Sequence, residues 1–243
     1  MLNTKNNFKA LSLSTESEVL NSHKLHTCNN EKGRSMIEML GVLAIIGVLS
    51  VGGIAGYSKA MMKFKTNKTI DQIAMTVTNI RTLFAQQSEY GFGDTPEKTA
   101  YDMGVVDDAM VVLDKDKKFS KLTNAFSGDV FIGTSSSGVQ GTTTGAFLVT
   151  FAKLPREACV AIATNDWGSG YSSGLLGIMT GAADKTELKA AADITACTVN
   201  GGTDPTTGAC AVGNVSAALS VSKAAAGCNC GTSNTCYVTF KYY

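Results

Sequence analysis

The stretch Gly33-Arg34-Ser35-Met36-Ile37-Glu38 joins a polar N-terminal segment to an apolar run that continues from Met39 to Tyr57 without a charged residue. A helix needs about 20 mostly apolar residues to cross the hydrocarbon core of a bilayer. The run therefore predicts a single membrane-spanning helix over residues 34–57. The one carboxylate of this helix, on Glu38, falls close to its start.

Residues 1–33 precede the helix and are mostly polar, with no apolar stretch long enough to serve as the core of a secretory signal. An ordinary signal carries its cleavage site after its apolar core. Here the candidate cleavage site, after Gly33, comes before the apolar run. Cleavage there would remove residues 1–33 as a leader peptide and leave the apolar helix on the mature chain.

The pattern of Gly33, then Glu38 at the fifth mature position, then a long apolar helix resembles the processing site of type IV pilins and pseudopilins. The resemblance implies that a prepilin peptidase cuts after Gly33 and methylates the new N-terminus. It also implies that Glu38 helps identical subunits register in a helical filament, which inner-membrane assembly machinery builds. The first mature position departs from the family, which prefers Phe or Met where this chain has Arg34.

Glu38 needs a physical explanation, because an ionised carboxylate in hydrocarbon is costly unless it finds a partner. A positively charged amine of a neighbouring subunit would be such a partner. The alternative is that Glu38 lies at the water interface of the membrane and is merely solvated. The upstream Gly33 and the apolar helix retained after cleavage favour the first interpretation.

The helix is predicted to continue beyond the membrane as an amphipathic segment over residues 58–90. Apolar residues recur there at steps of three and four between Ile70 and Phe84, with charged and amide residues between them. Such a stripe packs on a globular core, so residues 91–243 are predicted to form one globular head. Small residues in the membrane half would allow close helix approach, namely Gly47, Gly52, Gly53 and Gly56.

A basic cluster of Lys59, Lys63, Lys65 and Lys68 follows the span directly. By the positive-inside rule alone, this cluster would place the C-terminal side in the cytoplasm. The pilin resemblance implies the opposite orientation, which the lysines of the leader also favour. We follow the resemblance and assign the cluster to the solvated face of the helix. Nucleic-acid binding is a weaker alternative for so short a cluster.

Six of the seven cysteines lie beyond the span, at Cys159, Cys197, Cys210, Cys228, Cys230 and Cys236. Their even number suits disulfide bonds, which persist outside the cytoplasm. The alternative is a metal site at Cys228 and Cys230. Both histidines of the chain, His23 and His26, lie in the leader, so the mature chain would lack a common metal ligand. We predict no metal and no cofactor.

The six cysteines allow fifteen pairings, and the sequence alone does not choose among them. The pairing that we favour is Cys197–Cys210, Cys159–Cys230 and Cys228–Cys236. Cys197 and Cys210 bracket a turn-rich loop that could bring them together. The long connection from Cys159 resembles the disulfide that closes the C-terminal region of type IVb pilins.

The fold is predicted to be α+β, with the long N-terminal helix packed on an antiparallel sheet. β-Branched and aromatic residues predict strands at 129–133, 145–151 and 235–243. Pro155 predicts the start of a short helix that carries Cys159, because a proline in the first helical turn loses no hydrogen bond. A second helix is predicted over 215–226. Glycine, serine and threonine predict surface loops at 134–144 and 168–174.

The head resembles that of PilS-like type IVb pilins over the run from Phe147 to Gly168, where a strand, a proline-led helix with a cysteine, and Trp167 follow one another. Trp167 is expected to be a half-buried anchor. The resemblance implies a structural subunit of a type IVb-like pilus, held in the bacterial inner membrane as a precursor and then part of an extracellular filament. Such pili serve adhesion, DNA transfer or motility.

Two alternatives to this function stay open. One is a minor pilin or pseudopilin of a secretion or conjugation apparatus. The other is a single-pass, signal-anchored protein with a ligand-binding head.

The composition suits an assembly subunit better than an enzyme. The 21 basic and 20 acidic residues of the chain fall to 17 of each once the four lysines and three glutamates of the leader are removed. A formally neutral subunit can stack without strong self-repulsion. The mature chain would have no histidine as a general base, and no glycine-rich loop followed by lysine is present to bind phosphate. We therefore predict no enzymatic activity.

Overall fold

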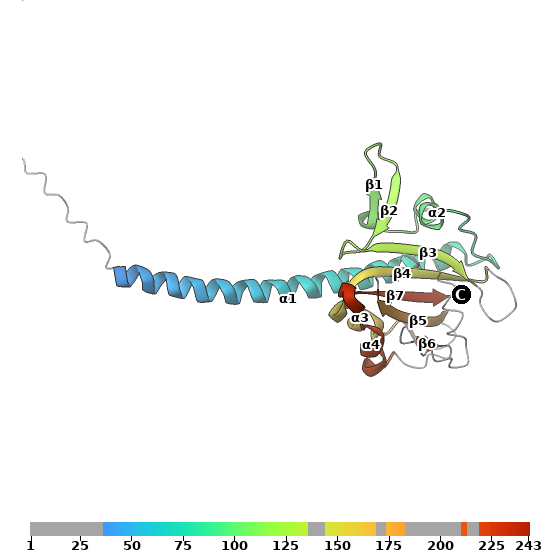
Figure 1. The fold of residues 1–243 in the computed structure, drawn as a ribbon. Helices are drawn as coiled ribbons and strands as arrows, with labels where there is room; N and C mark the ends of the chain where they lie inside the picture. Colours follow the sequence, from blue (N-terminus) through green and yellow to red (C-terminus); the bar gives the residue numbers. More distant parts are fainter. Residues whose placement is uncertain (1–35, 136–143, 169–173, 183–209, 213–218) are drawn as a thin grey trace, which may run out of the picture. The chain divides into compact units, whose positions relative to one another are not determined.

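The computed structural model of the chain describes residues 36–135, 144–168, 174–182, 210–212 and 219–243. It divides the chain into two compact units, Met1–Val51 and Gly52–Tyr243. The described elements, labelled in Figure 1, are α1 (Met36–Leu83), α2 (Pro96–Asp102), η1 (Asp108–Met110), β1 (Val111–Leu113), β2 (Phe119–Thr123), β3 (Asp129–Ser135), β4 (Ala146–Pro155), α3 (Arg156–Ala163), β5 (Leu175–Ala182), β6 (Cys210–Val212), α4 (Val221–Gly227), η4 (Gly231–Ser233) and β7 (Thr235–Tyr242).

Helix α1 is one continuous helix of 48 residues, as the two apolar patterns predicted. It ends at Leu83, so the prediction that the helix reaches residue 90 was too long. Phe84 turns into the core at 5% exposure, and its ring packs against those of Tyr90 and Phe92 at centroid distances of 5.2 and 5.4 Å. This aromatic cluster draws the chain back towards the core directly after the last helical residue.

The head contains a seven-stranded sheet with the strand order β1-β2-β3-β4-β7-β5-β6. Every neighbouring pair of strands is antiparallel. The last strand of the chain, β7, lies between β4 and β5, which are consecutive strands in the sequence (Figure 1). The C-terminal segment therefore holds the middle of the sheet together.

The core lies between α1 and one face of this sheet. Alternate residues of β4 and β7, among them Val149 and Phe240, belong to the same buried cluster as Ile73 and Ile80 of α1. Val149 and Phe240 are direct cross-strand partners in the β4–β7 ladder. Every second residue of these strands faces the apolar stripe of α1. The core is thus made from one face of the sheet and one face of the helix.

The structure confirms the predicted α+β class and all three predicted strands, which are β3, β4 and β7. Strands β3 and β4 run further than predicted, to Ser135 and Pro155, whereas β7 ends one residue earlier, at Tyr242. The proline-led helix is also confirmed, since α3 begins directly after Pro155, which occupies the N-cap position. The second predicted helix is present as the shorter α4 (Val221–Gly227), while residues 213–218 lie outside the described part of the chain. Strands β1, β2 and β5 and helix α2 were not predicted.

The predicted disulfide pairing was wrong for two of the three bonds. Cys159 is bonded to Cys228, and Cys230 is bonded to Cys236. Cys228 caps the C-terminus of α4, and α4 packs on α3, which carries Cys159. Cys230 instead precedes the short turn η4, which leads within six residues to Cys236 at the start of β7. The third predicted pair remains a prediction, because Cys197 lies outside the described residues.

Candidate functional site

The apolar part of α1 is the first candidate for a functional surface. Every residue from Met36 to Val51 is exposed, and the large apolar side chains in this part are 47–82% exposed. This stretch lies in the one helix, among the described residues, that is long and apolar enough to cross a membrane. Because continuous exposed apolar surface of this kind marks a membrane or protein contact, the segment requires lipid or other helices around it.

Glu38 lies in the first turn of α1 and is exposed. Its neighbours on the helix, including Ile37 and Met39, are apolar and exposed as well. A carboxylate near a helix N-terminus is favoured by the helix dipole. The positions of Gly33 and Arg34, which the sequence analysis linked to Glu38, lie outside the described residues.

The head half of α1 carries polar residues on its buried side. Thr66 and Thr69 bond to the helix itself, each donating its hydroxyl to the carbonyl oxygen four residues earlier at 2.9 Å. Thr76 lies 3.9 Å from the sulfur of Met110. The Oε1 atom of Gln72 is buried without a hydrogen-bond partner among the described residues. The helix therefore docks on the head through a mixed surface, unlike the segment from Met36 to Val51, in which Glu38 is the one charged residue.

The outward side of the same half-helix presents apolar and basic side chains. Tyr57, Phe64 and Met75 are 67, 62 and 50% exposed, and their spacing of seven and eleven residues places them on one face of a helix. The cluster Lys59–Lys68 lies among them. Lys65 folds back, with its ammonium 5.9 Å from the centre of the Phe126 ring. The other three lysines of the cluster are exposed.

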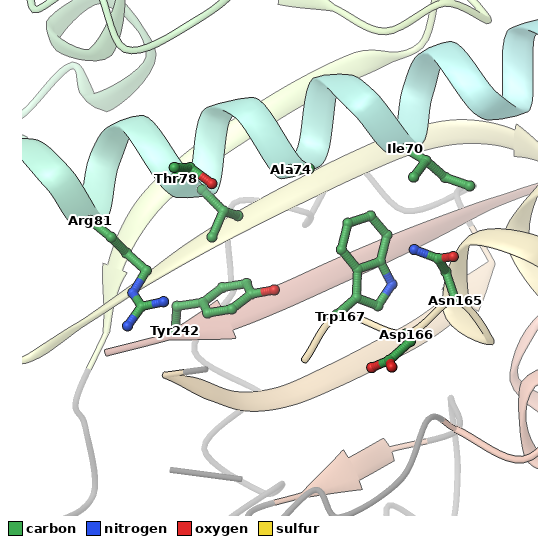
Figure 2. Close-up of a pocket in the computed structure, with 9 residues that line it drawn as sticks. Ile70, Ala74, Thr78, Arg81, Asn165, Asp166, Trp167 and Tyr242 are labelled. Carbon is green, nitrogen blue, oxygen red and sulfur yellow. The ribbon is translucent and has the colours of Figure 1, made fainter. Parts of the chain in front are cut away.

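A groove of about 310 Å³ runs beside α1 in the head. Its lining residues come from α1, from the segment after α3 and from β7, and are Ile70, Ala74, Val77, Thr78, Arg81, Asn165, Asp166, Trp167 and Tyr242. Figure 2 shows the rings of Trp167 and Tyr242 beneath the helix. Burial raises the pKa of the Tyr242 phenol well above its usual value, and the nearby Arg81 only partly opposes this shift.

Trp167 is a half-buried anchor at the edge of this groove. Its indole nitrogen donates to the carbonyl oxygen of Ile162 at 2.8 Å. Its ring meets that of Phe240 edge-on, with 4.7 Å between the ring centres. Because its one hydrogen-bond donor is used inside the head, Trp167 offers the groove an apolar face rather than a polar contact.

The cysteines are the predicted site residues that the structure brings together, in the two bonds described above. Cys210 lies in β6, and its side chain is outside the described part. Among the described residues, no group of three or more His, Cys, Asp or Glu side chains is arranged to hold a metal ion. The groove beside α1 was not predicted, since its residues come from three distant parts of the chain and share no motif.

An exposed apolar helix that continues into an α+β head with C-terminal disulfides defines the class of type IV pilin subunits, which are structural proteins. The family model named Bundlin matches residues 59–208. The chain belongs to the Bundlin family.

Two curated relatives carry the name "Major structural subunit of bundle-forming pilus". The relative from Escherichia coli O127:H6 (strain E2348/69 / EPEC) is 26% identical over 152 residues, which is 60% of this chain and 72% of the relative. The relative from Escherichia coli O111:H- is 26% identical over 141 residues, which is 57% of this chain and 67% of the relative.

Two solved structures are similar to the chain. The type IVb pilin from Salmonella typhi has a TM-score of 0.46 and 19% identity, over 72% of this chain and 98% of that chain. TcpA, a type IV pilin from the Vibrio cholerae El Tor biotype, has a TM-score of 0.47 and 12% identity, over 74% of this chain and 99% of that chain.

Proposed function

We propose that the chain is made as a membrane-anchored precursor, is cut after Gly33 by a prepilin peptidase, and then polymerises with identical copies into an extracellular type IVb-like pilus. The observation that carries this proposal is the unbroken exposure of apolar residues from Met36 to Val51. The same surface suits two successive environments. It can lie in lipid in the precursor and among neighbouring helices in a filament, where small residues allow close approach.

Glu38 has a defined part in this proposal. In the assembled filament its carboxylate pairs with the new N-terminal amine of an adjacent copy, which satisfies both charges away from water. The pair sets the axial position at which one helix adds beside another. The inner-membrane assembly machinery supplies the site of addition. No catalytic activity is assigned to the head, in keeping with the structural role that the names of the Bundlin relatives state.

The alternative of a minor pilin or pseudopilin shares the processing step but predicts a low copy number and no abundant filament. The alternative of a signal-anchored protein predicts that the chain stays uncut in the membrane. The groove beside Trp167 and Tyr242 is the feature that a ligand-binding head would use.

The experiment that tests the proposal is the N-terminal sequence and intact mass of the chain, recovered from membranes and from sheared cell-surface material. We expect a chain that starts at Arg34, is abundant in the sheared fraction, and gains about six mass units on reduction if three disulfides form. Replacing Gly33→Leu should leave the full-length chain in the membrane. Asn30→Leu, a similar change inside the leader, should be processed normally. A wild-type chain that keeps Met1 and never reaches the sheared fraction would contradict the proposal.

A further inference from the structure

Basic and acidic residues are concentrated in two separate stretches of the head, and the proposed function assigns no role to either stretch. Residues 59–68 of α1, called here the basic collar, contain four lysines and no acid. Residues 89–108, called here the acidic segment, contain six carboxylates and one lysine. Both stretches lie in the unit Gly52–Tyr243. A formally neutral mature chain thus carries two patches of opposite sign.

The collar is not neutralised within its own head. Lys59, Lys63 and Lys68 are exposed, and none of them takes part in the ion pairs found among the described residues, which involve Lys98, Lys121 and Lys153. Lysines in this position also oppose export of the head, because basic residues next to a span favour the cytoplasmic side. Their presence there calls for a role after export.

The acidic segment is only partly neutralised. Asp102 pairs with Lys98 in α2, and the carboxylate of Asp107 accepts from the backbone nitrogen of Ala109 at 3.1 Å. The remaining acids include three exposed ones without an ion pair among the described residues, namely Glu89, Asp94 and Asp108. The acidic segment therefore has exposed carboxylates that can bind a positively charged partner.

Lys63 lies too far from Glu89 and Asp94 to meet them within one chain. These two acids lie on either side of Phe92, whose ring packs on that of Phe84 directly after the end of α1. From Lys63 to Leu83 the helix rises about 30 Å, at about 1.5 Å per residue. That distance exceeds the Debye length of about 8 Å at physiological salt. The other end of the acidic segment returns along the helix, where Asn79 donates to the carbonyl oxygen of Val105 at 3.1 Å. A second copy shifted along the helix by a similar distance would, however, place its acidic segment beside the collar of the first.

We propose that the basic collar of one subunit docks against the acidic segment of a second copy of this chain, shifted by about 30 Å along the helix. The inference rests on the proposed function, since it requires a filament of identical copies. The exposed side chains of Tyr57, Phe64 and Met75 lie on the collar half of α1 and become covered in the same contact. Complementary charge would fix the order of addition and speed encounter of the subunits.

Contact with anionic lipid headgroups is the competing use of the collar. It accounts for the lysines, because basic residues beside a span are attracted to an anionic leaflet. It leaves the acidic segment without a role, since a negatively charged surface would repel Glu89 and Asp94. The charge complementarity of the two patches therefore favours a second copy as the partner.

Cross-linking between two distinguishable chains tests the contact directly. One chain carries Lys63→Cys, the other carries Asp94→Cys, and both are expressed in the same piliated cells. Each has one added thiol, so a short bis-maleimide can link these two positions only between copies. We expect a cross-linked dimer in sheared filaments when both chains are present and none when either is expressed alone. The matched control pairs Lys63→Cys with Lys223→Cys, an exposed lysine on α4, and should give no dimer.

Charge exchange in the full-length chain gives the second readout. Lys63→Glu with Lys68→Glu, or Glu89→Lys with Asp94→Lys, should each lower the yield of sheared filament about tenfold or more, because like charges then face each other. The combination of all four should restore most of the yield. The control is Lys115→Glu with Lys223→Glu. It changes the net charge of the chain by as much as the collar variant does, but at positions outside both patches, and should leave the yield unchanged.

The outcomes distinguish a failure of the docking contact from a failure of the proposed pilin function. Filaments that contain both cysteine variants but give no 63–94 cross-link would overturn the docking contact alone. So would a variant with all four charge reversals that is processed but does not regain the filament yield. A collar variant that loses membrane association, while the reversal of the acidic segment has no effect, would assign the collar to lipid and overturn it too. Absence of any filament from the wild-type chain would overturn the proposed function itself.

Discussion

A disulfide joins Cys159 of α3 to Cys228 at the C-terminus of α4, across a sequence separation of 69 residues. Both cysteines are fully buried. Two residues later Cys230 forms its own bond to Cys236, the second residue of strand β7. The two bonds therefore hold the segment 228–236 at both of its ends. They also fix where the last strand, β7, begins between β4 and β5.

The first prediction is that the two disulfides differ in their contribution to stability. In the chain-entropy model a closed loop of 69 residues stabilises by about 4 kcal/mol and a loop of six by about 2 kcal/mol. The double variant Cys159→Ala/Cys228→Ala should thus lose about twice as much free energy of unfolding as Cys230→Ala/Cys236→Ala. Urea denaturation of the full chain in detergent measures both. Equal losses would show that the loop-entropy argument does not hold here.

The same segment shows why the sequence could not predict the pairing. Cys228 and Cys230 are two residues apart, so exchanging their partners changes neither loop length by more than two residues. The choice depends on where α4 ends relative to α3, which is a tertiary contact between helices that no local pattern encodes. The sequence could establish that the cysteines are available for disulfides, but not which partner each one takes.

The strands also divide into those that a local sequence pattern predicted and those that it did not. Strands β3, β4 and β7 have β-branched and aromatic residues, and the sequence predicted them. Strand β5 (Leu175–Ala182) is buried on both faces except at its last residue. A strand buried on both sides loses the polar–apolar alternation that identifies strands, and two glycines within it weaken the signal further. Strand β1 has only three residues, too few for any pattern to be recognised.

The exposed apolar surface of α1 was the most predictable of the candidate functional surfaces. The charge-free run from Met39 to Tyr57 is a local feature that can be recognised without knowledge of the fold. The processing site at Gly33 remains a prediction. In contrast to the apolar run, the groove depends on which distant segments meet. Arg81, Trp167 and Tyr242 come together only once α1, the segment after α3 and β7 are assembled on one side of the sheet.

The second prediction concerns Gly128, where the chain passes close to β4. The side chain of Asn124 accepts from the backbone nitrogen of Gly128 at 3.1 Å and donates to the carbonyl oxygen of Ala152 at 2.8 Å. A Cβ atom on Gly128 would lie 1.9 Å from that same oxygen. Gly128→Ala should therefore destabilise the head by about 3 kcal/mol or more, because backbone has to move.

The matched control for this variant is Gly133→Ala in β3. A Cβ atom there meets nothing within 4 Å. Alanine is also preferred to glycine inside a strand by about 0.5–1 kcal/mol. Thermal unfolding of the two variants should move in opposite directions. A Gly128→Ala chain as stable as wild type would contradict the close approach of the two segments.

The third prediction concerns a polar pair inside the sheet. The hydroxyl oxygens of Thr150 and Thr239 lie 2.8 Å apart, and both residues are buried as direct partners in the β4–β7 ladder. Replacing either one by valine leaves the other hydroxyl buried without its partner, at a cost of about 1–3 kcal/mol. The double variant Thr150→Val/Thr239→Val should recover most of this loss, because both polar groups are then removed.

A double-mutant cycle from urea denaturation measures the coupling between the two residues. The control is Thr134→Val, an exposed position on β3, which should change the free energy of unfolding by less than about 0.5 kcal/mol. Additive losses in the cycle would mean that each hydroxyl has another partner and that the pair is not a unit.

The fourth prediction is a loss of stability in alkali that depends on Tyr242. Burial raises the pKa of its phenol above the ordinary value of 10.0, so the folded chain holds this proton after the unfolded chain has released it. For a group whose folded pKa is raised, the stabilising contribution is complete below the unfolded pKa and is lost as the pH rises above it. At pH 10.5 the loss from this one phenol should be about 1 kcal/mol relative to pH 8.

Tyr242→Phe separates this effect from other groups that titrate in the same range. Burial lowers the pKa of the neighbouring Lys241 from 10.5, and this group acts in the opposite direction, because the unfolded chain then binds more protons and stability rises with pH. Lys241 is present in both chains, so its contribution cancels when the pH-dependent change in the free energy of unfolding is compared between wild type and Tyr242→Phe. Urea denaturation at pH 8 and pH 10.5 should show the variant losing about 1 kcal/mol less than wild type over the interval. Equal losses in the two chains would mean that the Tyr242 phenol ionises as readily in the folded head as in the unfolded chain.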